Sequence, residues 1–312
     1  MDLRLYRQLE QRNPNFIRLL NRYPSRHYKV YKIPKRTFGF RTIAQPTPNV
    51  KQVQKLVISL LSEKVNVHPC ATAYVQGKSI KDNASYHVKS EYLLKVDLEN
   101  FFNSITPKML FKALKKQSIS LTDQDMLVLE QCLFWNMSKK LNGKLVLSVG
   151  APSSPYVSNV IMYSFDKRMS KICAKNNINY TRYADDLTFS TNTKGLLFGH
   201  LNEVRKLLKK EFGAKLTLNE SKTVFSSKAH NRHITGVTIT NNNKLSLGRD
   251  RKRYISALIH KFKHSQLSED DIYHLKGLIS HALHIESKFV HRMIKKYSKE
   301  TLNSIRKYPS GA

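Results

Sequence analysis

The sequence predicts an α+β fold in which short strands form one mixed sheet and helices pack against it. Three observations predict this class. Residues 92–98, "YLLKVDL", are a short apolar run of strand length that contains Asp97 near its end. Residues 180–190, "YTRYADDLTFS", place Asp185 and Asp186 between two runs rich in aromatic and β-branched residues, as in a hairpin. Segments with helical periodicity separate and follow these strands, and the order β, α, α, β, β, α, β is that of a split βαβ arrangement.

The other elements follow from local patterns. Apolar residues at helical spacing predict helices at residues 2–22, 49–65, 106–117, 121–135, 154–172, 196–212 and in most of the chain after 247. Alternation predicts a hairpin over 27–46 with Gly39 at its turn, and strands near 215–226 and 233–240. Two helix starts carry recognisable caps: Thr122 precedes an acidic first turn, and Ser154 precedes Pro155 at a first helical position.

Composition limits the possible partners. The 312 residues suffice for two or three subdomains. The excess of 54 Lys and Arg over 22 Asp and Glu gives a formal charge of +32, which indicates an anionic partner, most often nucleic acid. We find no apolar run of membrane-spanning length and no signal segment, so no membrane partner is expected. Three scattered cysteines indicate neither a zinc site nor a disulfide framework, and predict a cytoplasmic protein with free thiols.

The positive charge is concentrated near the N-terminus. Residues 11–62 contain no Asp or Glu, but eleven Lys and Arg are interleaved there with aromatic residues. A short basic run is usually a solvated face. Over fifty residues, this pattern favours a surface that faces phosphates.

Three aspartates stand out because they lie in apolar strand contexts: Asp97, Asp185 and Asp186. Taken alone, the Asp pair fits an ordinary hairpin turn. If Asp97 lies beside the hairpin, however, the three carboxylates need divalent cations in order to stay ionised together. Oxygen ligands without nearby His or Cys favour Mg²⁺. Two such ions about 3.5–4 Å apart would support phosphoryl transfer on nucleic acid.

Ordered motifs then reveal a family resemblance. "VDLENFF" (96–102), "GAPSSP" (150–155) and "RYADDL" (182–187) resemble successive motifs of reverse transcriptases, with "IPKRTFGFRTIAQP" (33–46) similar to the fingers motif and "LNESKTVF" (218–225) to the motif after the catalytic hairpin. "NASYH" (83–87) and "ITG" (234–236) are similar to the NAxxH and VTG elements of bacterial retron reverse transcriptases. The resemblance covers residues from about 27 to 300.

The resemblance implies a right-hand polymerase. Its parts would be an N-terminal helix and fingers at 1–91, a split-βαβ (ferredoxin-like) palm at 92–240 and a helical, RNA-binding thumb at 241–312. A helical insertion at about 106–135 would interrupt the palm.

The resemblance also implies roles for single residues. Asp97 and Asp185 would bind two Mg²⁺ ions directly, and Asp186 would complete the acidic cluster. Phe102 would exclude the ribose 2′-OH, while Phe101 would be a core residue. The contacts to the incoming nucleotide would come from Arg41, Lys35, Gly150, Ala151 and Lys222, the last as proton donor to the leaving pyrophosphate.

Several of these roles have structural alternatives. Phe102 could be a core residue, Lys35 and its neighbour Arg36 could belong to a generic basic hairpin, and Lys222 could be a surface lysine on a turn. The chain also departs from the family pattern, since Val149 stands where a Gln usually precedes Gly150. That change puts processivity or nucleotide affinity in doubt.

Further residues are implied to bind RNA or primer. Asn83 and His87 would help recognise the cognate RNA, or would instead form hydrogen bonds at the fingers–palm junction. Thr235 and Gly236 would form the turn of a primer-gripping hairpin. The thumb candidates for RNA contact, with solvated helix charge as their alternative, are Arg249, Arg251, Lys252 and Arg253.

The function implied is reverse transcription of one structured noncoding RNA with deoxynucleoside triphosphates. Priming from the 2′-OH of an internal guanosine would leave branched RNA-linked single-stranded DNA. Family likeness also implies antiphage defence with a separate effector protein, and a host RNase H that trims the template. Two alternatives are a group II intron type of reverse transcriptase, against which the short C-terminal region counts, and a non-catalytic RNA-binding scaffold.

Overall fold

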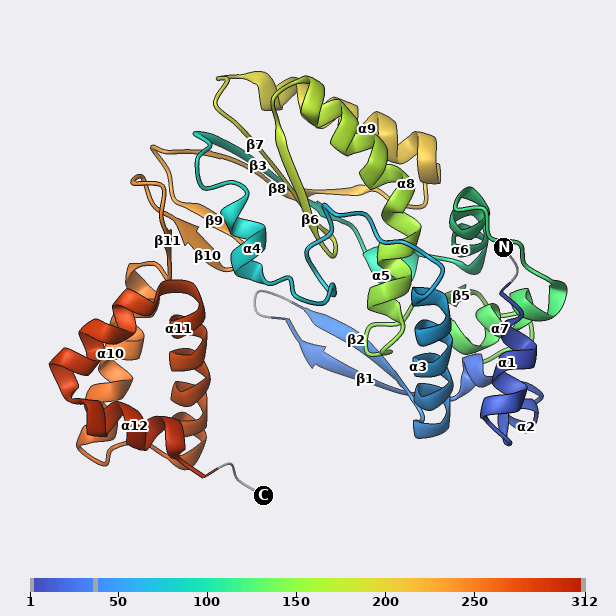
Figure 1. The fold of residues 1–312 in the computed structure, drawn as a ribbon, viewed down its shortest axis with the longest axis horizontal. Coiled ribbons are helices and arrows are strands. Elements are labelled where there is room, and N and C mark those ends of the chain that lie inside the picture. Colours follow the sequence, from blue (N-terminus) through green and yellow to red (C-terminus); the bar gives the residue numbers. More distant parts are fainter. Residues whose placement is uncertain (1–2, 36–38, 310–312) are drawn as a thin grey trace.

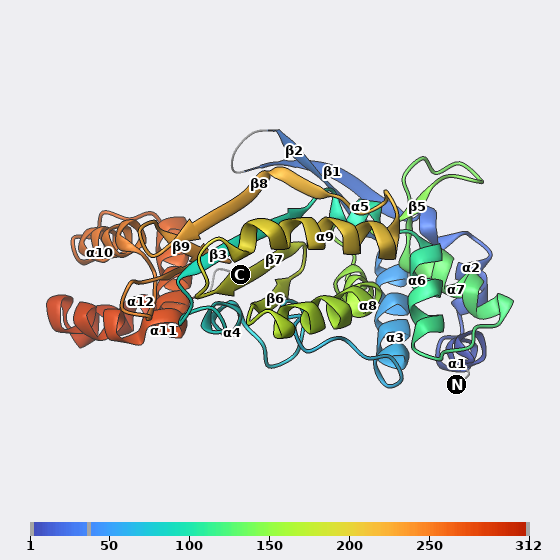
Figure 2. The same cartoon turned by 90° about the horizontal axis from the view of Figure 1, so that it is seen from above.

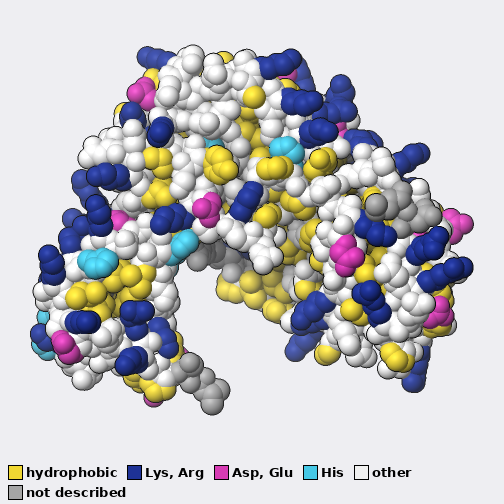
Figure 3. All heavy atoms as spheres, in the orientation of Figure 1, with side chains coloured by type: hydrophobic (Ala, Val, Ile, Leu, Met, Phe, Trp, Pro, Cys, Tyr) yellow, Lys and Arg dark blue, Asp and Glu magenta, His cyan; other side chains and the backbone are white. Residues whose placement is uncertain are grey.

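The computed structural model describes residues 3–35 and 39–309. The chain forms an arch, with the C-terminal helices at one end and the N-terminal helices at the other (Figures 1 and 2). In the space-filling view the molecule is hollowed between the C-terminal helices and the rest of the chain (Figure 3). Within the described residues, no helix is both long and apolar enough to cross a membrane.

The N-terminal part contains a β-hairpin with helices on either side. Its elements are α1 (Leu5–Arg12), α2 (Phe16–Leu20), a 3-10 turn (Pro24–Arg26), β1 (Tyr28–Pro34), β2 (Phe40–Pro46), α3 (Pro48–Ser62) and α4 (Ile80–Ser85). The hairpin predicted over 27–46 is confirmed, because β1 and β2 pair antiparallel along their whole length. The single helix predicted over 2–22 is wrong. Asn13 has extended backbone angles, as expected for a residue before proline, and divides it into α1 and α2.

A four-stranded sheet forms the centre of the molecule. It consists of β3 (Tyr92–Leu98), β6 (Asn179–Tyr183), β7 (Asp186–Thr191) and β8 (Leu218–Ser227), in the spatial order β6-β7-β3-β8. This is the ferredoxin-like order that a split βαβ arrangement predicts. Neighbouring strands pair antiparallel throughout, so the prediction of a mixed sheet is wrong. The two remaining strands of this region, β4 (Trp135–Asn136) and β5 (Leu145–Val146), form a separate short hairpin.

Helices cover one face of this sheet. These are α8 (Ser154–Lys175) and α9 (Leu196–Phe212), which contact β6, β7 and β3, and Figure 1 shows the β1–β2 hairpin on the other side of the sheet from α9. The apolar stripe predicted for α8 is confirmed, since Val157, Val160 and Phe165 are buried. The predicted cap is one residue off, because Ser153 is the N-cap and its side chain makes no capping hydrogen bond.

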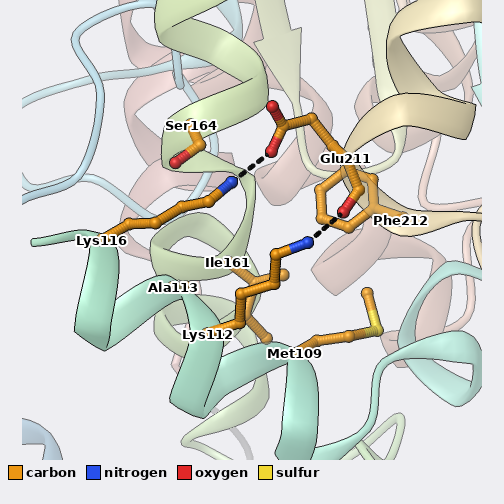
Figure 4. Close-up of a pocket in the computed structure, with 8 residues that line it drawn as sticks. All are labelled: Met109, Lys112, Ala113, Lys116, Ile161, Ser164, Glu211 and Phe212. Carbon is orange, nitrogen blue, oxygen red and sulfur yellow. Dashed lines mark hydrogen bonds and ion pairs between the residues drawn. The ribbon is translucent and has the colours of Figure 1, made fainter.

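The predicted helical insertion at about 106–135 contains α6 (Pro107–Lys116) and α7 (Asp123–Leu133), and the short helix α5 (Phe101–Ser104) precedes it. Thr122 caps α7 as expected and forms a reciprocal capping box with Asp125. Polar contacts at a small, mostly apolar pocket tie the insertion to α9 (Figure 4). There the carboxylate of Glu211 accepts from Lys116 Nζ at 2.6 Å, and the backbone carbonyl of Glu211 accepts from Lys112 Nζ at 3.3 Å.

The C-terminal part has its own apolar cluster. Its elements are β9 (Arg232–Ile234), β10 (Val237–Ile239), β11 (Leu245–Ser246), α10 (Arg249–Lys263), α11 (Glu269–Tyr297) and α12 (Lys299–Lys307). The cluster joins Ile234, Val237 and Ile239 to the three helices and includes Ala84 and Leu93 at its border. A larger cluster joins α1–α3 to the central sheet and to α5–α9, so the N-terminal helices share the main core.

Candidate active site

The three aspartates lie at one end of the two central strands. Asp97 of β3 is the cross-strand partner of Asp186, the first residue of β7. Asp185 precedes it in the β6–β7 turn, where its carbonyl accepts a hydrogen bond of 3.0 Å from Leu98 N. The prediction that Asp97 lies beside the hairpin is therefore confirmed, because antiparallel pairing brings these distant segments together.

The carboxylates disfavour one another's ionisation. Burial raises the pKa of Asp185, and the charge of Asp97 raises it further, while Lys222 and Arg41 act in the opposite direction. Partial removal from water, followed by the charges of Asp185 and Asp97, raises the pKa of Asp186 to about 6. A positive charge among these groups would therefore be stabilising.

Lys222 of β8 supplies one such charge. Its Nζ lies 3.0 Å from Oδ1 of Asp97, in an ion pair whose lysine side chain is 61 % exposed. An exposed pair of this kind contributes little to stability. The contact does place a proton-bearing ammonium beside the acidic cluster.

The donor set fits a hard divalent cation. All three groups are carboxylates, and their mutual repulsion would be relieved by such an ion. In the described part of the chain, no three Asp, Glu, His or Cys side chains are arranged to surround one ion. The three carboxylates would supply some of the ligands, and Mg²⁺ usually retains waters and substrate phosphate oxygens as the others.

The β1–β2 hairpin and the 150–155 loop are joined beside this site. Ala44 N of β2 donates to Val149 O at 2.9 Å. Gly150 follows with a φ of +120°, and a Cβ there would lie 3.0 Å from Ile43 Cγ2. The position therefore requires glycine. The side chain of Ala151 is buried in the same small cluster as Ala44.

The predicted fingers residues lie on this hairpin. Arg41 is exposed on β2, and its charge lowers the pKa of Asp185, so the guanidinium lies close enough to the acidic site to act on it electrostatically. Lys35 is exposed after β1, and Arg36 lies outside the described residues. The structure thus brings Arg41 into the electrostatic environment of Asp185.

Phe101 and Phe102 differ in burial, as their predicted roles require. Strand neighbours would differ because they face opposite ways, but both residues belong to the short helix α5. Phe101 is buried at 3 % exposure, whereas Phe102 is half-buried, with the two ring centroids 5.4 Å apart.

The structure contradicts direct RNA contact by Asn83 and His87, because both side chains are fully buried. Thr72 Oγ1 donates to Asn83 Oδ1 at 3.1 Å. The two ring nitrogens of His87 lie 2.7 Å from Ser190 Oγ and 2.8 Å from Thr181 Oγ1, and burial lowers the pKa of His87 to about 3. The alternative, hydrogen bonding inside the protein, is the one that the structure supports.

The predicted turn at Thr235 and Gly236 is confirmed. It joins β9 to β10, with φ of 46° and 81°. Among the thumb candidates, Arg251 donates to Gly236 O at 3.1 Å, and Lys252 pairs with Glu286 at 2.7 Å. These two cations are thus committed to contacts within the protein.

Arg249 and Arg253 remain exposed at the start of α10 and are available to phosphates. Sequence reasoning assigned no role to Arg182, Asp166 or Asn159, which form a buried polar network behind the acidic turn. The only sequence signal was the position of Arg182 inside the "RYADDL" motif.

The comparisons with known proteins agree with this geometry. The family model described as "Reverse transcriptase (RNA-dependent DNA polymerase)" matches residues 33–239. The retron Ec83 reverse transcriptase of Escherichia coli is 54% identical over 311 residues, which cover 100% of both chains. The retron Ec86 reverse transcriptase of the same species is 30% identical, with 88% of this chain and 84% of the relative covered.

A solved structure shares the fold at low identity. The apo telomerase from Candida tropicalis has a TM-score of 0.51 and 13% identity, with 90% of this chain and 61% of that chain covered. This likeness agrees with the right-hand polymerase fold. The family match and the full-length relative show that the chain belongs to the reverse transcriptases, and among them to the retron reverse transcriptases.

Proposed function

We propose that this RNA-directed DNA polymerase copies one specific structured noncoding RNA into single-stranded DNA. Reverse transcriptase activity follows from the family to which the chain belongs. The observation that carries the finer proposal is the 54% identity to a retron enzyme over the whole chain, together with the acidic site formed by Asp97, Asp185 and Asp186.

Reverse transcriptases generally use divalent metal ions, and we propose that this chain uses two Mg²⁺ ions held by the three aspartates. When bound, such ions activate the attacking hydroxyl and neutralise charge on the triphosphate. The oxygen-only donor set and the raised pKa values of Asp185 and Asp186 support this choice.

The surrounding side chains would bind and orient the nucleotide. Arg41 would bind the triphosphate through its planar fork, and Lys35 would add charge at the hairpin end. Phe102 would stand against the ribose C2′ position. Lys222 is the proposed proton donor to the leaving pyrophosphate, because its ammonium already lies within hydrogen-bonding distance of Asp97.

Backbone and thumb contacts would hold the template and primer. Gly150 and Ala151 would let the loop backbone approach the nucleic acid, and the turn at Thr235 and Gly236 would contact the primer. The exposed Arg249 and Arg253 would bind RNA phosphates. In this proposal residues 1–91 form the fingers, 92–240 the palm and 241–312 the thumb.

The retron resemblance extends the proposal beyond the chain. Synthesis would begin from the 2′-OH of an internal guanosine of the RNA and give a branched RNA–DNA product. A host RNase H would trim the template, and a separate effector protein would act with the complex in antiphage defence in the bacterial cytoplasm.

The nucleic acid that copurifies with the chain tests this proposal. We would express the native locus, digest portions with RNase, DNase or debranching enzyme, and sequence the products. The matched variants are Asp185→Ala, at the acidic turn, and Asp270→Ala, an exposed carboxylate at the start of α11.

The expected product is short single-stranded DNA joined 2′ to RNA, present with wild type and Asp270→Ala and absent with Asp185→Ala. RNA alone, with DNA synthesis only on added primers, would contradict the self-priming proposal. No DNA synthesis under either condition would indicate an RNA-binding scaffold.

A further inference from the structure

A guanidinium lies fully buried behind the acidic turn. Arg182 of β6 and Asp166 of α8 both have 0 % exposure. Arg182 Nη2 lies 2.6 Å from Asp166 Oδ2, and Nε donates to Oδ1 at 3.0 Å. A buried ion pair of this kind is weak support for stability, because desolvation offsets most of the attraction. The fork of Arg182, however, makes further contacts.

The third nitrogen of Arg182 reaches the catalytic turn. Its Nη1 donates to Ala184 O at 3.0 Å and to Asn159 Oδ1 at 3.0 Å. Ala184 immediately precedes Asp185 and has a φ of 57°, a left-handed conformation that a residue with a Cβ adopts at some cost. The hydrogen bond to Ala184 O therefore fixes a backbone conformation that local preference disfavours.

The same network also fixes the segment beside the turn. Asn159 Nδ2 donates to Ala73 O at 2.9 Å, and Thr72 N donates to Arg182 O at 2.8 Å. Ala71 forms a parallel bridge with Arg182. The guanidinium of Arg182 thus joins helix α8 to the turn that carries Asp185, while the backbone of Arg182 and the side chain of Asn159 hold the 71–73 segment beside it.

Tyr180 offers an internal comparison. Its hydroxyl donates to Asp166 Oδ1 at 2.8 Å, so it belongs to the same buried network. In the described structure its hydroxyl hydrogen bond goes to Asp166 and not to the turn. If the network only stabilises the fold, loss of either partner of Asp166 should have a similar effect on metal binding. If the network orients the turn, only the loss of the Arg182 fork should weaken metal binding.

We propose that Arg182 is a positioning residue that holds Asp185 in the orientation needed to bind metal, through its hydrogen bond to Ala184 O. The inference rests on the proposed function, in which Asp185 is a metal ligand. Residues that orient metal ligands from behind typically change metal affinity about 10- to 100-fold when they are replaced.

The test compares Arg182→Lys with Tyr180→Phe in the full chain bound to an annealed RNA template and DNA primer. Lysine keeps the positive charge beside Asp166, but its single ammonium cannot replace the fork that reaches Asp166, Asn159 and Ala184 together. We would measure Mn²⁺ binding by electron paramagnetic resonance, the Mg²⁺ concentration for half-maximal primer extension, and the melting temperature.

For Arg182→Lys we expect about tenfold weaker Mn²⁺ binding and a similar rise in the Mg²⁺ requirement. Tyr180→Phe should lower the melting temperature and leave both metal measurements at the wild-type values. Equal Mn²⁺ binding by the two variants, at a temperature where both are folded, would overturn the proposal and leave Arg182 a structural residue.

Two additional variants keep the result decisive. If Arg182→Lys does not fold, the double variant Arg182→Met with Asp166→Leu removes both buried charges together, and with them the hydrogen bond to Ala184 O, and it should weaken Mn²⁺ binding in the same direction. Unchanged binding would overturn the proposal. Asp185→Ala tests the metal role of Asp185 separately from the positioning role of Arg182. Unchanged Mn²⁺ binding in that variant would refute the metal role of Asp185 itself.

Discussion

Replacement of His87 by leucine tests whether the NAxxH element acts through the fold. Leucine is apolar and removes the hydrogen bonds to Thr181 Oγ1 at 2.8 Å and to Ser190 Oγ at 2.7 Å. Ser190 keeps Ser90 as a partner at 2.9 Å, whereas Thr181 Oγ1 would be left buried without its imidazole. From one unsatisfied hydroxyl and one lost hydrogen bond we expect a loss of about 2–4 kcal/mol in the free energy of unfolding.

The same variant should change the dependence of stability on pH. Folded His87 has a pKa lowered to about 3 from an ordinary 6.5, so below pH 6.5 the unfolded chain binds a proton that the folded chain excludes. Wild-type stability therefore falls as the pH falls from about 6.5 toward 3. At pH 5 this proton binding by the unfolded chain lowers the free energy of unfolding of wild type by about 2 kcal/mol. The difference in free energy of unfolding between wild type and His87→Leu should therefore be about 2 kcal/mol smaller at pH 5 than at pH 7.5.

Thermal unfolding at both pH values, with RNA binding measured alongside, checks this reasoning. At pH 7.5 the melting temperature should fall by about 3–6 °C. Tyr86→Ala, at an adjacent residue that is 59 % exposed, should leave it nearly unchanged. If His87→Leu keeps the wild-type melting temperature and loses only RNA affinity, the imidazole contacts RNA and the assignment to the interior is wrong.

Three other substitutions address the nucleotide site. Gly150→Ala should lower the free energy of unfolding by about 1–3 kcal/mol and reduce primer extension, because Gly150 has a φ of +120° and a Cβ there would contact Ile43. Gly199→Ala, in α9 with open space around it, should preserve primer extension. Equal effects of the two substitutions on primer extension would contradict this reasoning. Phe102→Val should allow incorporation of ribonucleotides, measured as the ratio of kcat/KM for dNTP and rNTP, and an unchanged ratio with lower stability would make Phe102 a core residue. Lys222→Gln should slow single-turnover incorporation by about a hundredfold if the lysine is the general acid, and a wild-type rate would exclude that role.

Local patterns predicted much of the fold. The strand at 92–98 and the helix cap at Thr122 were predicted to the residue, because an apolar run and a cap are local signals. The break at Asn13 could also have been predicted, since Pro14 disfavours helical angles in the residue before it. The strand directions in the central sheet could not, because pairing between distant segments determines them.

In the site, too, local signals could be predicted and contacts between distant segments could not. The acidic trio was recognisable because carboxylates are unusual in apolar strands, and antiparallel pairing then placed Asp97 opposite Asp186. The burial of His87 depends on Thr181 and Ser190, which lie 94 and 103 residues away, and Asn83 donates to Thr235, 152 residues away, as well as accepting from the nearby Thr72. No local pattern indicates the distant partners. The pairing of Arg182 with Asp166 could not be predicted either, because a charged residue in a predicted strand is normally expected to be exposed to solvent.

The two apolar clusters also set how the chain can be recombined. Residues 232–308 carry almost all of one cluster, with Ala84 and Leu93 as its contributors from elsewhere. The N-terminal helices, by contrast, contribute Leu5, Leu9 and Phe16 to the core of the central sheet. Chimeras between relatives should therefore tolerate exchange of the C-terminal segment as a unit. Exchange of residues 1–91 would join two halves of one interior that have not been matched to each other. If the C-terminal helices bind the RNA as proposed, RNA specificity could be transplanted with them and changed independently of the polymerising core.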